Sequence, residues 1–243
     1  MKKHRSEAGQ LLLEGERLVE DALLSALPVR CCIVEGEKED RYAHIVSAAR
    51  DRAIPVLRAS ARMTAKLSDT PHPQGVFAVV AQPPTDAAAA IAAAPAGRPL
   101  FALHGISDPG NLGTIARSTE WFGGGALLLS EDSVDVFNSK ALRGSMGSLL
   151  RLRIGVYEDF NWLERAAASA GRTLAATAME GGTAPADFTG AGSTVLLLGG
   201  EAHGLSPELL ARVPQRISIP GGGAESLNIA IAHAVLSYAF SHR

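Results

Sequence analysis

The chain has 243 residues, of which 47% are hydrophobic and 20% are charged, close to the composition of an ordinary soluble protein. This length allows one large domain or two modest ones, each with its own core. The formal net charge of −2 gives no sign of a generally basic nucleic-acid binder, and no apolar run approaches the roughly 18 residues that a membrane helix needs.

The first residues and the cysteines bear on the compartment. Residues 1–5 resemble the basic start of a signal peptide, but Ser6, Glu7 and Glu14 interrupt any apolar stretch that would follow, so we do not expect secretion. The two cysteines, Cys31 and Cys32, are adjacent, and a bridge between neighbours is strained and closes no useful loop. We expect two reduced thiols, no metal site built from them and the scattered histidines, and a cytoplasmic location.

The first 81 residues predict a small α/β domain. Glu14–Leu27 has apolar residues at helical spacing, and a more polar helix is predicted near Asp40–Arg52. Short apolar runs predict strands at Cys31–Val34, Ile54–Leu57 and Val76–Ala81.

Residues 82–97 predict a linker between two domains. Pro83 and Pro84 open this segment, an alanine tract follows, and Pro95 and Gly97 close it. Asp86 is suitably placed to cap a short helix through the alanines, which Pro95 must end.

Residues 98–243 predict a larger, mostly parallel α/β domain. Strands are predicted at Pro99–His104, Ala126–Leu129, Leu152–Gly155, Arg172–Thr177, Thr194–Leu198 and Arg216–Ile219, with helices at Leu112–Phe122, Asn161–Ala170 and Leu227–Phe240. Solidly apolar strands such as 195–198 indicate a sheet that is covered on both faces. The last helix is apolar nearly all round, so we expect it in the core or in a dimer interface.

The first chemically rich turn is HGISDPGNLGTIARSTEWFG, residues 104–123. Asn111 occupies the place of a helix N-cap, and Gly123 occupies the place of its C′ stop. Arg117 points away from the apolar face formed by Leu112, Ile115, Thr119 and Phe122. Taken alone, Asn111 is more simply a cap and Arg117 a surface cation.

The second turn is LLLGGEAHGLSPELL, residues 196–210. Its two glycines, Gly199 and Gly204, are spaced as in a phosphate loop, but Leu205 stands where the phosphate-binding lysine is needed. This difference argues against a nucleotide hydrolase, which a nucleotide-binding titration would test. What remains is a turn that brings backbone close to a ligand, with Glu201 in it as either a functional or a solvated acid. Ser206-Pro207-Glu208 then predicts the start of a short helix.

The third turn is ISIPGGGAESLNIAIAHAVL, residues 217–236. Its glycines, 221–223, allow backbone amides to approach a ligand. Ser226 is a candidate cap for the final helix. Asn228 has little structural work to do at the head of so apolar a helix, which makes it a functional candidate.

A cluster of positive charge lies between residues 136 and 157, where the sequence has four cations and no acids. A solvated face and a phosphate-binding patch are about equally compatible with it. The cations are Lys140, Arg143, Arg151 and Arg153.

Taken together, the three turns resemble the SpoU/TrmH family of RNA 2′-O-methyltransferases, members of the SPOUT superfamily. The resemblance rests on NLGTIARSTEWFG (111–123), LLLGGEAHGLSPE (196–208) and ISIPGGGAESLNIAIA (217–232), helped by RGSMGSLLRL (143–152). LLLEGERLVEDAL (11–23) and HPQGVFAVV (72–80) resemble the family's substrate-binding domain, whose fold is similar to that of a ribosomal protein. Two departures are a third motif one residue shorter than usual and Ala202 where glycine is common.

The resemblance implies a fold and a reaction. The implied fold is a SPOUT-type parallel sheet with a trefoil knot in 98–243, a substrate-binding domain in 1–81, and a homodimer. The implied reaction is S-adenosylmethionine-dependent methylation of a ribose 2′-hydroxyl without a metal, on ribosomal RNA in preference to transfer RNA. A non-catalytic RNA-binding protein that keeps the fold is the alternative.

The resemblance also implies roles for individual residues. Arg117 acts on the 2′-hydroxyl, and Glu201 orients nearby groups. The residues implied to hold Arg117 and the ribose are Asn111, Ser226 and Asn228. Those implied to hold the cofactor, mostly through backbone, are Leu198, Gly199, Ile219 and Leu227. RNA phosphates are expected at the 140–153 cations.

Overall fold

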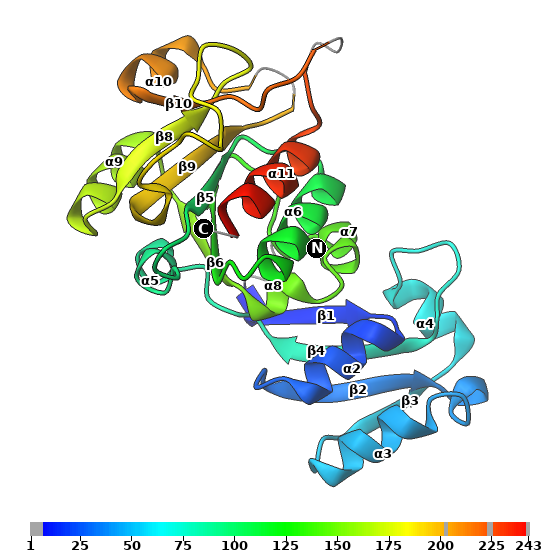
Figure 1. The fold of residues 1–243 in the computed structure, drawn as a ribbon. Helices are drawn as coiled ribbons and strands as arrows, with labels where there is room; N and C mark the ends of the chain where they lie inside the picture. The colour runs from blue at the N-terminus through cyan, green and yellow to red at the C-terminus, as the bar shows by residue number, and fades with distance from the viewer. Residues whose placement is uncertain (1–6, 202–203, 223–225, 242–243) are drawn as a thin grey trace.

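The computed structural model describes residues 7–201, 204–222 and 226–241, which fold around two separate sheets (Figure 1). The first sheet has four strands in the order β1-β4-β2-β3, and the second has six in the order β10-β8-β9-β5-β6-β7. Ala202 and Gly223, which lie in two of the turns of interest, fall outside the described residues.

The N-terminal sheet mixes pairing directions. Strand β4 (Val76–Ala81) lies antiparallel between β1 (Gln10–Glu14) and β2 (Val29–Glu35), and β3 (Val56–Ala59) runs parallel to β2. Its helices are α2 (Glu16–Leu24), α3 (Ala43–Asp51) and α4 (Ala61–Leu67), with a 3₁₀ turn at Gly36–Lys38. The three predicted strands of this part are therefore confirmed.

The predicted helix Glu14–Leu27 was wrong at both ends, and strand β1 was missed. Gly15 has a φ of 102°, a left-handed conformation that breaks the chain between β1 and α2. Leu11 and Leu13 are buried at alternate positions of β1, but an apolar run of three residues is too short to show the period of a strand.

The two cysteines are free thiols on β2, as predicted. Cys32 is fully buried, and this burial raises its pKa to about 11. The thiol of Cys32 is therefore a neutral part of the core.

The C-terminal sheet is parallel throughout, and its six strands confirm the predicted six within two or three residues. They are β5 (Leu100–His104), β6 (Ala126–Ser130), β7 (Arg153–Tyr157), β8 (Thr173–Thr177), β9 (Thr194–Gly199) and β10 (Gln215–Ile217). The first five residues of β9 are all buried, as the apolar run 195–198 predicted.

Helices cover both faces of this sheet (Figure 1). On one face lie α6 (Pro109–Trp121), α7 (Ser139–Gly144), α8 (Ser148–Arg151) and α11 (Ile229–Ser241). On the other lie α5 (Ala87–Ala92), α9 (Phe160–Ser169) and α10 (Pro207–Arg212); a 3₁₀ turn at Ala191–Ser193 precedes β9. Among the described residues, no helix combines the length and the apolar character needed to cross a membrane.

The alanine tract of residues 82–97 forms α5, capped as predicted by Asp86, which accepts a hydrogen bond from the backbone N–H of Ala89 at 3.0 Å. This helix packs closely on β7: a Cβ added to Gly155 would lie 2.5 Å from Cα of Ala87. The alanines are small so that helix and strand can touch, and this part of the segment belongs to the helical layer of the second sheet.

Candidate active site at the carboxyl ends of β5 and β9

Three chain segments meet beyond the ends of two neighbouring strands. β5 and β9 pair in parallel, so the loops that follow them leave the same edge of the sheet. The backbone N–H of Gly200 donates to the carbonyl of His104 at 2.8 Å and joins the two loops at their start. The head of α11 completes the site.

Glu201 connects the second loop to the first. One carboxylate oxygen accepts hydrogen bonds from the backbone N–H and the hydroxyl of Ser107, both at 3.1 Å. The other accepts from the side-chain amide of Asn111 at 2.7 Å and from the backbone N–H of Asp108 at 3.4 Å. Glu201 is exposed, but these four hydrogen bonds hold its carboxylate in place, and its functional role stays a prediction.

The cap of α6 is Asp108 and not, as predicted, Asn111. Asp108 accepts from the backbone N–H of Gly110 at 2.6 Å, and Pro109 is the first helical residue. The helix thus begins three residues earlier than predicted, and the side chain of Asn111 is free to bind Glu201. The stop at Gly123, with a φ of 76°, is confirmed.

The electrostatics of the site favour an ionised Glu201. Burial raises its pKa, but the hydrogen bonds from Asn111 and Ser107 outweigh this effect and leave the pKa below its ordinary value. The amino end of α6, which points at this carboxylate, stabilises the same charge. Glu201 is therefore an acceptor that fixes neighbouring donors at neutral pH, and not an acid that gives up a proton.

Asn228 connects the third segment to the same cluster. Its side-chain amide donates to Oδ1 of Asn111 at 3.1 Å. Its own Oδ1 accepts from the backbone N–H groups of Ala230 at 2.8 Å and Ile231 at 3.4 Å, which caps α11. The expectation that Asn228 does little structural work was wrong. Ser226 is exposed and forms no hydrogen bond with the described residues.

Arg117 lies on α6, nearly two turns beyond Asn111. Its side chain is exposed, as the helical pattern predicted, and it forms no ion pair or hydrogen bond with the part of the chain that the structure describes. Trp121, one turn further along, is 82% exposed. Arg117 is thus an exposed cation without an ion-pair partner in the described chain, on the same helix as Asn111.

Glycines let the loops come this close. A side chain on Gly200 would collide with the carbonyl of Gly105, and one on Gly199 would collide with the backbone of Gly204. At both positions the backbone approaches too closely for any residue with a side chain. The two glycines therefore have a structural reason that does not depend on a phosphate loop.

The residues expected to hold a cofactor border one edge of this cluster. Leu198 is buried at the end of β9, Ile219 is half-buried, and Leu227 is 50% exposed. The backbone of 219–222 forms no hydrogen bond with the described residues, so the N–H groups of 219, 221 and 222 and the four C=O groups have no partner there. Unpaired backbone beside apolar side chains fits an adenosine, which offers polar ring edges and an apolar ring face.

Two of the four predicted RNA-binding cations form no ion pair with the N-terminal domain in the described chain. Lys140, on α7, is 3.2 Å from the cap residue Asp108, and its side chain is 63% exposed. Arg153, at the start of β7, is exposed and has no ion pair in the described chain. Lys140 therefore brings positive charge to the amino end of α6.

The other two cations, Arg143 and Arg151, lie at the junction between the two domains. Nη1 of Arg143 is 3.9 Å from Glu14, and Nη1 of Arg151 is 3.3 Å from Asp21. Arg151 also binds Glu120. These partners are acids of the same chain, so an RNA contact by either arginine stays a prediction.

Sequence reasoning missed Ser107, Asp108 and the buried His233. The pair Asp108-Pro109 is itself a helix-start signal that would have found the true cap. His233, on α11, is buried between hydroxyls of α6: its Nδ1 is 2.9 Å from Ser118 Oγ and its Nε2 is 3.1 Å from Thr119 Oγ1. Periodicity alone cannot distinguish such a histidine from its apolar neighbours.

A second polar cluster lies in the N-terminal domain, away from these loops. The imidazole Nε2 of His44 is 3.0 Å from Glu20 and 3.5 Å from Glu16. The ligand atoms of these three residues lie within 4.8 Å of one another. His44 contacts each glutamate at the surface of the domain, and clusters of acidic groups near a surface are common without a bound ion.

Comparisons with known proteins agree with this geometry. Residues 99–238 match the SpoU rRNA Methylase family, and residues 1–78 match the MRM3-like substrate binding domain. The chain is 29% identical over 238 residues to the 23S rRNA (guanosine(2553)-2′-O)-methyltransferase RlmP of Bacillus subtilis, covering 98% of this chain and 90% of that protein.

Two solved structures share the fold over 99% of this chain at 27% identity. One is the AdoMet-bound rRNA methyltransferase of Sinorhizobium meliloti, with a TM-score of 0.84 and 90% of that chain covered. The other is the SpoU methyltransferase AviRb of Streptomyces viridochromogenes in complex with AdoMet, with a TM-score of 0.85 and 92% covered. The family match spans more than half of the chain, and the three loops that define the site lie inside it, so this protein is a member of the SpoU rRNA methylase family.

Proposed function

We propose that the protein methylates a ribose 2′-hydroxyl of large-subunit ribosomal RNA, with S-adenosylmethionine as the methyl donor. The observation that carries this proposal is the convergence of Asn111, Glu201 and Asn228 from three different segments, with Arg117, a cation unpaired in the described chain, on the same helix as Asn111. A scaffold protein without catalysis has no need for such a network. Of the relatives named above, RlmP is a 23S rRNA 2′-O-methyltransferase and the Sinorhizobium meliloti protein is an rRNA methyltransferase.

S-adenosylmethionine supplies a methyl group on a sulfonium, which is already a good leaving group, so the protein has to align the reactants. Leu198, Gly199, Ile219 and Leu227 hold it, mostly through backbone groups. Glu201 ties the cofactor loop to the head of α6, so the two binding surfaces keep one spacing. Asn228 extends the same bond system to α11.

Arg117 is the group that meets the ribose. A guanidinium is effectively always protonated, so Arg117 acts as a donor: it clamps the phosphate next to the target and polarises the 2′-hydroxyl. Asn111 stands at the amino end of the same helix, and Ser226 and Asn228 lie at the head of α11, where they hold the ribose.

The two domains divide the work. Residues 98–243 carry the reaction, residues 1–81 bind the RNA substrate, and residues 82–97 link them. Phosphate contacts begin at Lys140 and Arg153, which face solvent, and binding should weaken with salt as counterions return. We place the protein in the cytoplasm, together with this substrate.

A trefoil knot and a homodimer complete the proposal. Strand β10 lies at the edge of the sheet, whereas α11, which follows it in the chain, packs against α6 and β9; this return toward the middle of the sheet supports a knot. One face of α11 is exposed and apolar, and Trp121 of α6 is exposed with it, which supports a second copy as the cover. The exposed residues of α11 and its head are Leu227, Ile231, Val235 and Tyr238.

The test uses purified protein, S-adenosylmethionine and ribosomal RNA that lacks its ribose methylations. We expect calorimetry to show cofactor binding and sequencing-based mapping to show one new 2′-O-methyl site. Arg117→Lys keeps the charge but loses the planar fork, and it should lower kcat by about 10-fold or more. Absence of cofactor binding by folded protein, with or without RNA, would contradict the enzymatic assignment.

A further inference from the structure

The guanidinium of Arg151 grips a carboxylate on the helix that carries Arg117. Its Nε lies 2.6 Å from Oε1 of Glu120 and its Nη2 lies 2.9 Å from Oε2, a two-point pairing. Nη2 also donates to the carbonyl of Met146 at 3.2 Å. This arginine, at the end of α8, lowers the pKa of Glu120 and keeps that carboxylate ionised.

Glu120 is placed where it would compete for Arg117. The two residues are three apart on α6, and side chains at this spacing are neighbours on a helix surface. Arg117 has no ion-pair partner in the described chain, so a free carboxylate at position 120 would have that guanidinium within reach. It would also repel an RNA phosphate bound there. The structure avoids both effects because both oxygens of Glu120 face Arg151.

We propose that Arg151 is a positioning residue for methyl transfer: by holding Glu120, it keeps Arg117 free for the RNA. The inference rests on the proposed function, in which Arg117 meets the ribose and its phosphate. In this proposal Arg151 acts through Glu120 and does not itself touch the ribose or its phosphate. Arg151 belongs to the basic segment 136–157. Its positive charge acts on the active site indirectly, by holding the carboxylate of Glu120 on α6.

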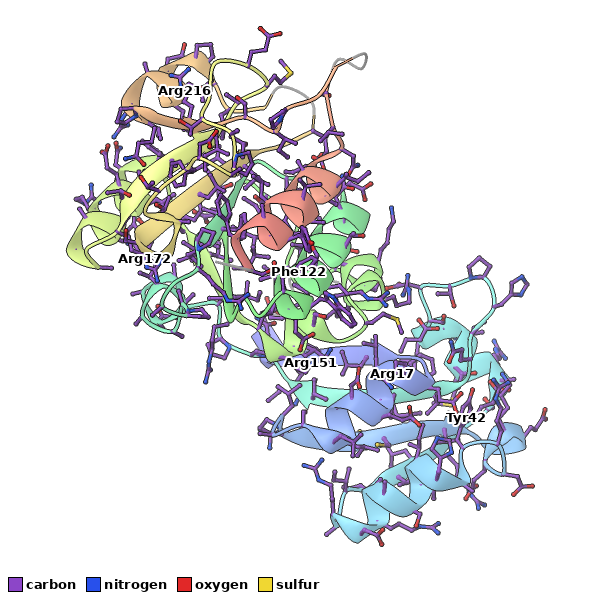
Figure 2. The ribbon with its side chains drawn as sticks, viewed as in Figure 1. Arg17, Tyr42, Phe122, Arg151, Arg172 and Arg216 are labelled. Atoms are coloured by element: carbon purple, nitrogen blue, oxygen red, sulfur yellow. The ribbon has the colours of Figure 1, made fainter. Side chains whose placement is uncertain are left out.

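The same arginine reaches the substrate-binding domain. Its third nitrogen, Nη1, is 3.3 Å from Oδ2 of Asp21 on α2, and Oδ1 of Asp21 is 3.4 Å from Arg17. Figure 2 shows Arg17 and Arg151 on facing elements across the domain junction. Asp21 contacts Nη1 of Arg151, which Glu120 does not use. Contact with the N-terminal domain therefore leaves both hydrogen bonds between Arg151 and Glu120 in place.

The decisive experiment is a rescue by a second substitution. Methylation of a ribosomal RNA fragment is measured at low salt for Arg151→Gln, Glu120→Gln and the double variant. We expect Arg151→Gln to lower kcat/KM about three- to ten-fold, because Glu120 then engages Arg117. Glu120→Gln should stay near wild type, and the double variant should recover to within about two-fold of wild type. The loss in Arg151→Gln should shrink as salt rises, because ions screen the new pair.

Controls separate this role from simple structural support. Arg212→Gln breaks another arginine–glutamate pair, the 2.6 Å contact with Glu164 on the opposite face of the sheet, and should not change activity. Thermal melting reports folding of each variant. If Arg151→Gln does not fold, Arg151→Lys with and without Glu120→Gln makes the same comparison.

Two results would overturn the inference: wild-type kcat/KM in folded Arg151→Gln, or no recovery in the double variant. Full activity of Arg117→Gln is a different failure. It would remove the proposed role of Arg117 in the reaction, and the role of Arg151 with it.

Discussion

Single side chains in this site act by accepting hydrogen bonds. Glu201 receives four of them, from two residues of one loop and from Asn111, and gives none. A carboxylate has the lone pairs for this and, when ionised, no proton to interfere. An acid in an active-site loop is commonly assigned to proton transfer, but these bonds assign Glu201 to holding the cofactor loop against α6.

We expect protonation of His233 to destabilise the folded protein. Its imidazole is fully buried beside Phe101 and next to the hydroxyls of Ser118, Thr119 and Ser237. Burial lowers its pKa to about 3, so the native protein keeps it neutral through the physiological range.

This shift predicts a pH dependence of stability. The unfolded chain protonates His233 below about pH 6.5, whereas the folded chain does not until about pH 3, so unfolding takes up a proton between these values. The contribution of His233 to the free energy of unfolding should therefore be complete above pH 6.5. Below pH 6 the free energy of unfolding should fall by about 1.4 kcal/mol per pH unit. Urea titrations check this between pH 6 and 5, before carboxylates titrate.

His233→Gln removes the titrating group and should flatten the curve in that window. The exposed His72 provides the matched control, and His72→Gln should leave the slope unchanged. An equally steep slope in His233→Gln would contradict the assignment.

At the scale of elements, periodicity predicted what is long and regular. Strands β5, β6 and β9 of the second sheet were predicted because parallel strands buried on both faces are continuous apolar runs. The short helices α4, α7 and α8 were missed because four to seven residues contain too few turns to show a helical period. The polar site was predicted through the resemblance, but the bonds between its loops were not.

One of these missed elements, α8, lies at the domain junction, and the turn that precedes it allows the two domains to approach closely. Gly147, which precedes α8, has a φ of 84°, and a Cβ there would lie 2.5 Å from Oδ2 of Asp21 and 2.6 Å from Nη1 of Arg151. Met146 also has a positive φ, 50°, although it is not glycine. The turn thus accepts unfavourable backbone so that α2 can approach α8.

We predict that Gly147→Ala loosens the two domains. The left-handed backbone costs about 1–2 kcal/mol for any residue with a Cβ, and the new methyl group also separates Asp21 from Arg151. Gly171→Ala is the matched control, since Gly171 has a φ of 67° and open space around it. Chemical denaturation should show a larger loss for Gly147→Ala, and small-angle scattering a larger radius of gyration. Equal losses of stability in the two variants would mean that the domain junction accommodates the new methyl group, and would contradict the prediction.

At the scale of the molecule, some charged residues form ion pairs between the two domains, and the sequence alone does not predict these pairs. Arg143 and Arg151 stand in the basic segment that predicted a phosphate patch, yet their partners are Glu14 and Asp21, more than a hundred residues away. Which acid faces which base depends on how two independently patterned domains dock, and no local pattern encodes that. The net charge of −2 therefore conceals paired charge at the junction.

The exposed face of α11 makes the last prediction, on assembly. The helix was expected in the core or in a dimer interface, and the structure buries one side against α6 and β9 and leaves Ile231 and Tyr238 exposed at 54% and 60%. Apolar side chains that recur along one helix face form a stripe, and a stripe of this kind is stabilised by a second copy. We predict a dimer that buries it.

Ile231→Glu places a charge in that stripe and should convert the dimer to monomers in sedimentation-velocity experiments, because an unpaired charge in an apolar interface is costly. Leu24→Glu makes the same change at an exposed leucine of the N-terminal domain, 87% exposed, and should leave the dimer intact. Since the head of α11 carries Asn228, loss of the dimer should also lower methyl transfer. A protein that is monomeric before substitution, or a dimer unaffected by Ile231→Glu, would assign the interface to another surface.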